Sequence, residues 1–261
     1  MIYCTMGKKR HYLHFFTSCI SFAVILIIWA LMTALFKWNE VVFPGPAQTV
    51  KSMWELIRSG VLLKHTAASL FRVTSGFYLA VLFGIPLGII LGRLKVARQF
   101  LNPVIHFLRP ISPLAWIPFA MLWFGIGDKP AVFLIFLSSF FPLVVSTMSA
   151  VSQIDPVYFC VAANFNLSRT ERVQKIIFPA ILPSIVTSLR ISVGVAWLVV
   201  VAAEMIAVKS GLGYLILDSR NGLRMDYVVS AMIVIGFIGL ILDYVMKRLE
   251  KIETVYWGTV R

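Results

Sequence analysis

The sequence has few charged residues and few cysteines. Only 13% of its 261 residues are charged, about half the share of an average soluble domain, and acidic residues are the scarcer sign, with 11 Asp and Glu against 24 Lys and Arg. The three cysteines (Cys4, Cys19 and Cys160) lie far apart and form no C-x-x-C pair, so neither a disulfide framework nor a thiolate metal cluster is expected. These shortages exclude a soluble enzyme and a disulfide-rich secreted domain.

Hydrophobic residues are abundant where charged ones are few. They account for 59% of the chain, and the mean hydropathy is +0.88, as is typical of a protein that lies in a lipid bilayer. The net charge is +13, which in a soluble protein would suggest a nucleic-acid partner. Because the charges lie between long apolar runs, the expected counterpart is the anionic cytoplasmic leaflet, and no nucleic-acid partner is expected.

Several apolar runs are long enough to cross a bilayer, which takes about 20 residues in a helix. They cover residues 15–36, 70–92, 130–151, 183–207 and 227–246. A sixth run, 111–127, is shorter and contains Pro113 and Pro118; we count it as a span so that the chain alternates across the membrane. The first run is too long for a cleaved signal peptide and no small-residue cleavage site follows it. The sequence therefore predicts an all-α polytopic membrane protein with six transmembrane helices.

The distribution of Lys and Arg indicates the orientation. With the N-terminus inside, the inside segments carry fourteen of these residues and the outside segments eight, as the positive-inside rule requires. We therefore expect a multi-pass protein of the inner or plasma membrane with both termini in the cytoplasm. Its parts are then a cytoplasmic segment 1–14, a transmembrane domain 15–246 with a cytoplasmic loop 152–182, and a cytoplasmic tail 247–261.

Small residues recur at every fourth position of the second span. They are Gly76, Ala80, Gly84, Gly88 and Gly92. Such a face lets a second helix approach closely, and we interpret it as a site of helix packing, which does not indicate a function.

A short amphipathic helix is predicted between the first two spans. It begins at Pro46 and ends before Gly60, and its apolar residues fall at i, i+3, i+4 and i+7, namely Val50, Met53, Trp54 and Ile57. Two interpretations stay open: a helix lying on the outer membrane surface, and a helix that covers the bundle.

The loop 152–182 contains two helix starts. Asp155 followed by Pro156 predicts a short helix that ends at Asn166, a residue that tolerates the left-handed conformation. Ser168 and Glu171 predict a capping box at the start of a second helix. Exposed apolar and cationic residues in this loop suggest docking to another protein, although a loop folded back on its own bundle is an equal alternative.

The same loop resembles a family motif. Cys160, Val161 and Ala162, then Asn166, Ile176 and Pro179, match the spacing of the E-A-A, three residues, G, nine residues, I-x-x-P motif of permease subunits of binding-protein-dependent ABC importers. Further stretches resemble the branch that handles nitrate, aliphatic sulfonates, taurine and thiamine-pyrimidine precursors. They are FPGP at 43–46, G-x(4)-H-x(3)-SL-x-R at 60–72, GF-x(2)-A-x(3)-G-x-PLG at 76–88, LRPISPLAWIPFAMLWFGIG at 108–127, FFP at 140–142, and AAEM at 202–205 followed by SGLGYLI.

The resemblance implies a MetI-like type I importer permease. Two copies would form the pathway as a homodimer, two cytoplasmic ATPase subunits would bind ATP and Mg and drive it, and an external binding protein would deliver the substrate. The loop would couple the chain to the ATPase through Cys160, Val161, Ala162, Ala163, Asn166, Ser168, Arg169, Glu171, Ile176 and Pro179. The chain has no G-x-x-x-x-G-K-[ST] phosphate loop, so it is expected to be a transporter subunit without its own cofactor and not an enzyme.

Two positions depart from the motif. The family's glutamate is Cys160 here and its glycine is Asn166. The first change removes a charge that could pair with the ATPase, and the second adds a side chain at a helix exit.

Among the ionisable residues inside spans, Arg190 and Glu204 are considered as candidates for function. Arg190 and Glu204 are about 21 Å apart along a helix, so they need separate partners; for Arg190 we expect snorkelling to the interface. For Glu204, two roles stay open: a structural hydrogen bond, or a contact with the translocation pathway. The candidate pathway or gate residues are Glu204, Met205, Gly211 and Gly213.

No metal site is expected. Of the histidines, only His11 and His14 stand at a helical spacing, which is a weak indication of metal binding, and His65 is expected to cap or pack. The competing class is an ion-coupled secondary transporter, which would show inverted repeats and midplane carboxylates. A membrane-embedded enzyme would need clustered His, Asp or Cys at one membrane face, and the sequence has no such cluster. The resemblance implies that the substrate is a small anion or a pyrimidine precursor, but the sequence does not identify it.

Overall fold

The computed structural model describes residues 20–35 and 42–250, and every regular element in these ranges is helical. The chain forms two compact units, Met1–Leu62 with Ile216–Ile233, and Leu63–Leu215 with Val234–Arg261. The all-α prediction is confirmed. The predictions for residues 1–14, for the ends of the first span and for most of the tail 247–261 lie outside the described residues, as do Cys4, Cys19, His11 and His14.

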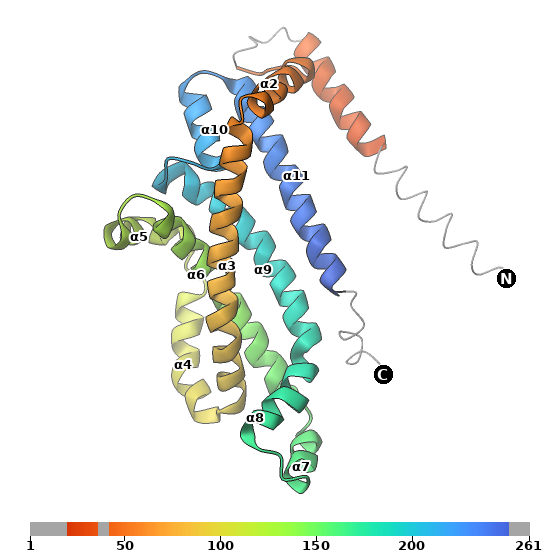
Figure 1. The fold of residues 1–261 in the computed structure, drawn as a ribbon, viewed down its shortest axis with the longest axis vertical. Helices are drawn as coiled ribbons and strands as arrows, with labels where there is room; N and C mark the ends of the chain where they lie inside the picture. Colours follow the sequence, from red (N-terminus) through yellow and green to blue (C-terminus); the bar gives the residue numbers. More distant parts are fainter. Residues whose placement is uncertain (1–19, 36–41, 251–261) are drawn as a thin grey trace, which may run out of the picture. The chain divides into compact units, whose positions relative to one another are not determined.

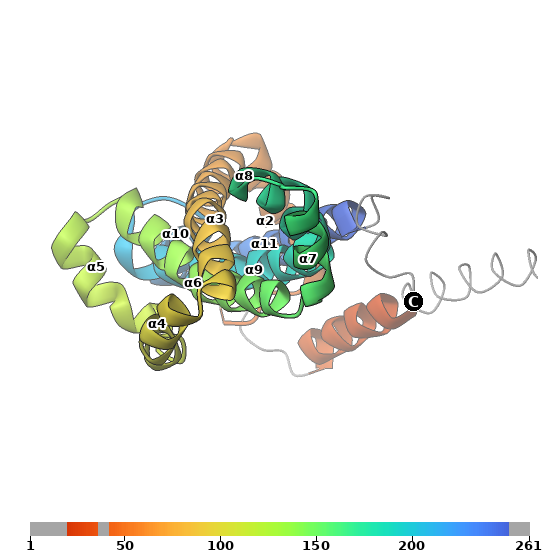
Figure 2. The same ribbon diagram turned by 90° about the horizontal axis from the view of Figure 1, so that it is seen from below.

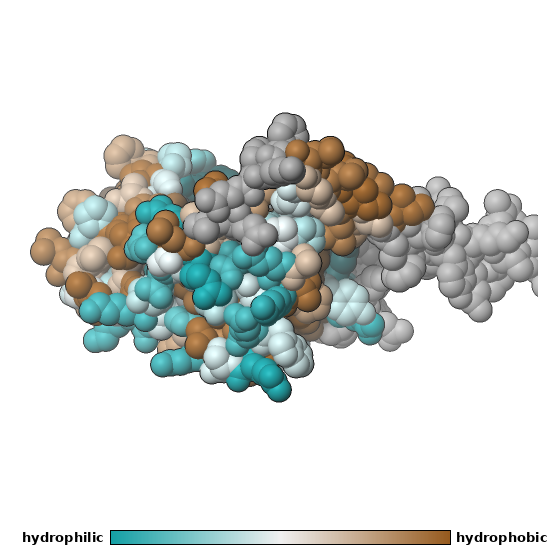
Figure 3. Space-filling model, turned by 90° about the horizontal axis from the view of Figure 1, so that it is seen from above, coloured by the Kyte–Doolittle hydropathy of each residue, from teal (hydrophilic) through white to brown (hydrophobic). Residues whose placement is uncertain are grey.

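The first unit contains an apolar helix and an amphipathic one. The helix Ile20–Leu35 is exposed on nearly every side, and its side chains form the brown surface to the upper right in Figure 3. A helix that is apolar all round is stable in lipid. Helix α2, Pro46–Arg58, begins with proline at its first position, and Gly60, at φ 73°, follows its end, as the sequence predicted.

Helix α2 is attached to its unit through small polar residues. Ser52 Oγ donates to Asp226 Oδ2 at 2.6 Å, and Ser230 Oγ donates to the carbonyl oxygen of Thr49 at 3.0 Å. The apolar stripe at Val50 and Trp54 is instead exposed. This arrangement favours the interpretation in which the apolar face of α2 rests on the membrane surface.

The second unit holds most of the long helices. In chain order the elements that follow α2 are α3 Val61–Arg93, α4 Lys95–Leu108, η1 Pro113–Trp116, α5 Ile117–Phe124, α6 Asp128–Ser152, α7 Pro156–Asn164, α8 Arg169–Arg172, the π-helix η2 Val173–Ile177, α9 Phe178–Ala207, α10 Leu212–Asn221 and α11 Met225–Glu250. Helices α3, α6 and α9 run along one another, with α7 and α8 at one end (Figure 1). Seen from that end, α4, α7 and α8 lie around the ends of α3 and α9 (Figure 2).

Four helical runs are long and apolar enough to cross a membrane, and a fifth crossing is present if the bent pair of α4 with η1 and α5 counts as one. The two members of that pair meet at 87°. The predicted single span 111–127 is therefore not one helix, because Pro113 begins η1 and Pro118 lies in the first turn of α5. Helix α5 alone, at about 12 Å, cannot cross a hydrocarbon core of about 30 Å.

The small-residue face of α3 lies against α6. A Cβ atom added to Gly76, Gly88 or Gly92 would lie 2.7, 2.6 or 2.5 Å from the Cβ of Ile135, Thr147 or Val151. Each partner stands 59 residues later in the sequence, so α3 and α6 run parallel. The chain between them must return to the end where α3 began, and the bent pair of α4 and α5 provides that return.

Helix α9 is held to its neighbours in the second unit by polar contacts. The hydroxyl groups of Ser146 on α6 and Ser188 on α9 are hydrogen-bonded. Arg190 forms ion pairs with Asp243 at 2.8 Å and Glu250 at 3.2 Å on α11. Arg190 and Glu204 thus have separate partners, as expected, but ion pairing and not snorkelling accounts for Arg190.

Candidate functional site

One face of α3 carries three polar side chains toward the segment that follows α9. They are His65, Ser69 and Arg72, at positions i, i+4 and i+7, which fall on one side of a helix. All three form hydrogen bonds with residues 204–213. This cluster lies at the end of α9 opposite α7 and α8 (Figure 1). We call it the outer-end network because the topology expected from the sequence puts this end of α9 outside.

The carboxylate of Glu204 is the centre of the outer-end network. Its side chain is 0% exposed, and both oxygens are satisfied. Oε1 accepts from Arg72 Nη1 at 2.6 Å, and Oε2 accepts from Ser69 Oγ at 2.8 Å and from the backbone N–H of Gly213 at 3.0 Å. A buried charge is stable only when it is paired and hydrogen-bonded in this way.

The guanidinium group of Arg72 connects three elements. It is 1% exposed, and besides Glu204 it donates to Asp128 Oδ1 through Nε at 2.8 Å and to the carbonyl oxygen and the hydroxyl of Ser210. Asp128 begins α6 and is 58% exposed. The fork geometry of arginine allows these bonds at the same time, so α3, α6 and the end of α9 are fixed to one another.

The segment after α9 approaches the network too closely for a side chain. Gly211 has φ 103°, and an added Cβ would overlap the carboxylate of Glu204. Its backbone N–H donates to His65 Nδ1 at 2.9 Å, and the N–H of Leu212 donates to Ser69 Oγ at 2.9 Å. His65 thus caps this segment, as the sequence predicted.

The candidate gate residues are therefore largely together. Glu204, Gly211 and Gly213 meet in the network, whereas Met205 is half-buried outside it. Sequence analysis did not identify Ser69, Arg72 or Asp128 as partners. The spacing of His65, Ser69 and Arg72 could have indicated a polar face on α3.

At the opposite end of α9, the loop between α6 and α9 has the predicted local structure. The Asp155 side chain accepts from the N–H of Val157 at 2.8 Å and caps α7. Asn166 has φ 51°, and the N–H of Leu167 donates to the carbonyl oxygen of Ala162 at 2.9 Å, which closes the helix as a Schellman motif does. The helix ends at Asn164 and the turn follows at once.

The second helix start is a complete capping box. Ser168 Oγ accepts from the N–H of Glu171, and Glu171 Oε2 accepts from the N–H of Ser168 at 3.0 Å. Glu171 lies in the loop before the expected span 183–207. The backbone N–H of Ser168, and after it the ammonium group of Lys175 at 3.0 Å, lower the pKa of the Glu171 carboxyl group to about 2. The box is therefore charged and intact at physiological pH.

The surface of this loop is mixed. Phe165 is 75% exposed, Tyr158 59% and Val161 46%, while Ala162 is fully buried. Cys160, Ala163, Arg169 and Pro179 are exposed and Ile176 is half-buried. Exposed aromatic side chains on a rigidly capped projection are typical of a docking surface.

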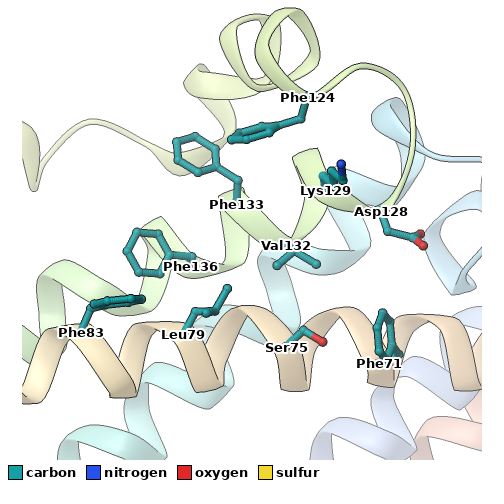
Figure 4. A pocket seen from close by; sticks show the side chains of 10 residues that line it. All are labelled: Phe71, Ser75, Leu79, Phe83, Phe124, Asp128, Lys129, Val132, Phe133 and Phe136. Carbon is teal, nitrogen blue, oxygen red and sulfur yellow. The ribbon is translucent and has the colours of Figure 1, made fainter.

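An aromatic groove lies beside the outer-end network. It has a volume of about 500 Å³ and is lined by Phe71, Leu79 and Phe83 of α3, Phe124 of α5, and Phe133 and Phe136 of α6. Its polar lining side chains are Ser75, Asp128 and Lys129, and Figure 4 shows Asp128 and Lys129 together at one end. The described residues contain no group of His, Cys, Asp and Glu side chains that could hold a metal ion.

The structure is that of a multi-helix membrane protein with a capped, exposed loop at one end of the bundle. Residues 84–252 match the family described as binding-protein-dependent transport system inner membrane component. The chain belongs to this family, the permease subunits of ABC importers. It is therefore a multi-pass membrane protein, and the competing hypotheses of a secondary transporter or a membrane enzyme are not supported.

The chain is similar to several permeases over most of its length. It is 37% identical to a putative ABC transporter permease protein of Methanocaldococcus jannaschii, covering 87% of each chain. It is 34% identical to the taurine transport system permease protein of Escherichia coli, covering 92% of this chain and 89% of that one. It is 33% identical to a nitrate import permease protein of Synechocystis, covering 94% of each.

The fold is shared with a solved structure. An inward-facing conformation of the MetNI methionine ABC transporter contains a chain that aligns with a TM-score of 0.63 at 16% identity, covering 76% of this chain and 96% of that one. The MetI-like fold predicted from the motifs is thus confirmed. At this identity the likeness concerns the fold alone.

Proposed function

We propose that this permease subunit transmits movement from a cytoplasmic ATPase along α9 to the outer-end network. The observation that carries this proposal is the position of two rigid features at opposite ends of α9: the capped loop 152–182 and the fully satisfied pair of Glu204 and Arg72. A capped projection can be displaced as a unit, and the continuous helix α9 can transmit that displacement from one end to the other.

The loop is the proposed coupling element. The proposed coupling residues are Cys160, Val161, Ala162 and Ala163 on α7, Asn166, Ser168, Arg169 and Glu171 in the turn and the second cap, and Ile176 and Pro179 near the start of α9. Ala162 is buried, so it supports the loop from inside. The polar caps keep the projection in one shape while Phe165 and Val161 supply apolar contact area.

The outer-end network is the proposed support of the gate. Glu204, Gly211 and Gly213 hold the segment after α9 on α3, and Met205 stands beside them. The small-residue face at Gly76, Ala80, Gly84, Gly88 and Gly92 is proposed to keep α3 and α6 moving as one body.

The partners follow from the family. We propose a homodimer of this chain, two cytoplasmic ATPase subunits that hold ATP and Mg, and an external binding protein. The proposed topology has both termini in the cytoplasm, with segments 1–14 and 247–261 on that side. Relatives are named for taurine and nitrate import, which supports a small anion of the nitrate or sulfonate kind as the substrate in preference to a pyrimidine precursor.

Co-purification with the ATPase tests the coupling proposal. Val161→Glu with Phe165→Glu places two charges on the exposed face of the loop, and Val96→Glu with Phe100→Glu places two on α4, where both side chains are at least as exposed. We expect the first pair to abolish ATPase binding and ATP-driven uptake in proteoliposomes and the α4 pair to leave both unchanged. Retention of the ATPase by the loop variant would overturn the proposed coupling role.

A further inference from the structure

A groove between the end of α3 and the start of α8 has an unusual combination of charge and apolar surface. It has a volume of about 430 Å³, and we call it the arginine groove. Its lining includes Arg93, Arg169 and Arg172 together with Ile89, Ile90 and Ile177. In Figure 2, α8 lies next to α3 at this end of the second unit.

In the part of the chain that the structure describes, the three guanidinium groups of the arginine groove have no carboxylate partner. Arg93 and Arg169 are exposed and Arg172 is half-buried. Within residues 42–250, none of Arg93, Arg169 and Arg172 forms an ion pair.

The contacts these arginines do make leave most of their donors available. Arg93 lies over the ring of Phe159 at 4.1 Å, and Arg172 Nε donates to the carbonyl oxygen of Leu167 at 2.9 Å. The nearest acidic residue in the sequence, Glu171, is already bound to Ser168 and Lys175. Because guanidinium groups match phosphate oxygens in shape and charge, the vacant donors favour an anion of the phosphate type.

The apolar part of the groove distinguishes between a free phosphate ion and a phospholipid as the ligand. Ile90 is 49% exposed, and Leu94 and Val173 also present apolar surface there. A free phosphate ion would leave this surface uncovered, whereas a phospholipid would place its phosphodiester on the arginines and an acyl chain along the isoleucines. The groove adjoins the π-helix η2, whose first and last residues, Val173 and Ile177, line it, and π turns are frequent at functional sites.

We propose that the arginine groove binds one anionic phospholipid of the cytoplasmic leaflet. The lipid headgroup bridges Arg93 at the end of α3 to Arg169 and Arg172 at the start of the run that leads into α9, and so ties the coupling loop to the parallel pair of α3 and α6. The proposal rests on the proposed topology, which puts this end of the bundle inside. It adds a lipid partner to the protein partners already named.

Native mass spectrometry of the detergent-solubilised full chain tests this binding. The probes are dioleoylphosphatidylglycerol and dioleoylphosphatidylcholine, and we expect the wild type to prefer the anionic lipid by at least about tenfold, since each basic residue near an anionic headgroup contributes severalfold. The triple variant R93Q, R169Q and R172Q should lose this preference.

A matched control removes three positive charges outside the groove. The control variant R98Q, R109Q and K247Q has the same net charge as the triple variant and should retain the wild-type preference. Equal loss in both variants, or no preference in the wild type, would overturn the proposal, because binding would then depend on diffuse surface charge.

Two further measurements separate the other occupants and any folding defect. Inorganic phosphate at millimolar concentration should not displace the lipid; if it does, the groove is a site for free phosphate. Addition of the ATPase should leave the lipid bound; if it displaces the lipid, the groove belongs to the protein interface. A phosphatidylglycerol with a photoreactive acyl chain should label 89–94 or 173–177 in the wild type without any variant, and labelling elsewhere would overturn the site.

The lipid measurement is independent of the coupling measurement. A chain that binds the anionic lipid but not the ATPase would refute the coupling role and leave the arginine groove established. A chain that binds the ATPase but shows no lipid preference would refute the lipid site and leave the coupling role intact.

Discussion

Arg72 and Glu204, 132 residues apart in the sequence, form an ion pair at 2.6 Å in which neither side chain is more than 1% exposed. Each nitrogen of the guanidinium has a further partner in Asp128 or Ser210, and Glu204 Oε2 accepts from Ser69 and Gly213. A buried pair of this kind contributes little net stability compared with apolar residues, but it strongly penalises the loss of one partner. Its consequence here is a single defined geometry for the outer end of α9.

Breaking the pair from one side should therefore be costly. Arg72→Met leaves the Glu204 carboxylate buried without a counter-charge, and we expect the free energy of unfolding to fall by about 3 kcal/mol or more. Combining Arg72→Met with Glu204→Gln removes the charge while keeping an acceptor for Ser69, so the double variant should be more stable than Arg72→Met alone. Thermal unfolding in detergent measures both; a double variant that loses the sum of the two single effects would show that the charges are not coupled.

This pair also marks the limit of what the sequence could predict. The caps at Asp155, Ser168 and Glu171 were predicted because each depends on residues within three or four positions. The partner of Glu204 depends on how α3 packs on α9, and no local pattern contains that information. The segment 111–127 was counted as one span so that the chain alternates across the membrane, but the structure begins η1 at Pro113 and places Pro118 in the first turn of α5.

The close approach at Gly211 gives a second prediction. Gly211→Ala places a methyl group on the Glu204 carboxylate and forces alanine to adopt φ 103°, which costs at least about 1 kcal/mol from backbone strain alone. Gly194→Ala, in α9 with open space around the added Cβ, is the matched control and should be neutral or slightly stabilising. Thermal stability and uptake rates should separate the two variants. Equal stability would contradict the close approach.

The turn after α7 gives a third prediction. Asn166 holds φ 51°, where glycine has no steric penalty and alanine pays about 1 kcal/mol. We expect Asn166→Gly to preserve or raise hydrogen-exchange protection in residues 156–166, and Asn166→Ala to lower it. The glycine also restores the family motif, so ATPase binding should persist in that variant. Greater protection in the alanine variant would show that the left-handed turn does not limit the stability of α7.

The acid dependence of the second cap gives a fourth prediction. The bond from the N–H of Ser168 and the charge of Lys175 lower the pKa of Glu171 to about 2 from an ordinary 4.5, so the folded loop favours the ionised form. The contribution of Glu171 is thus fully present above pH 4.5 and is lost as the pH falls through about 2. The carboxyl carbon of selectively labelled Glu171, followed by NMR in nanodiscs, should titrate well below the ordinary range, and Ser168→Gly should keep the Lys175 contribution while weakening the cap. Titration near 4.5 in the wild type would mean that the capping box is not formed in the membrane-embedded protein, because an ionised carboxylate that accepts these bonds cannot keep its ordinary proton affinity.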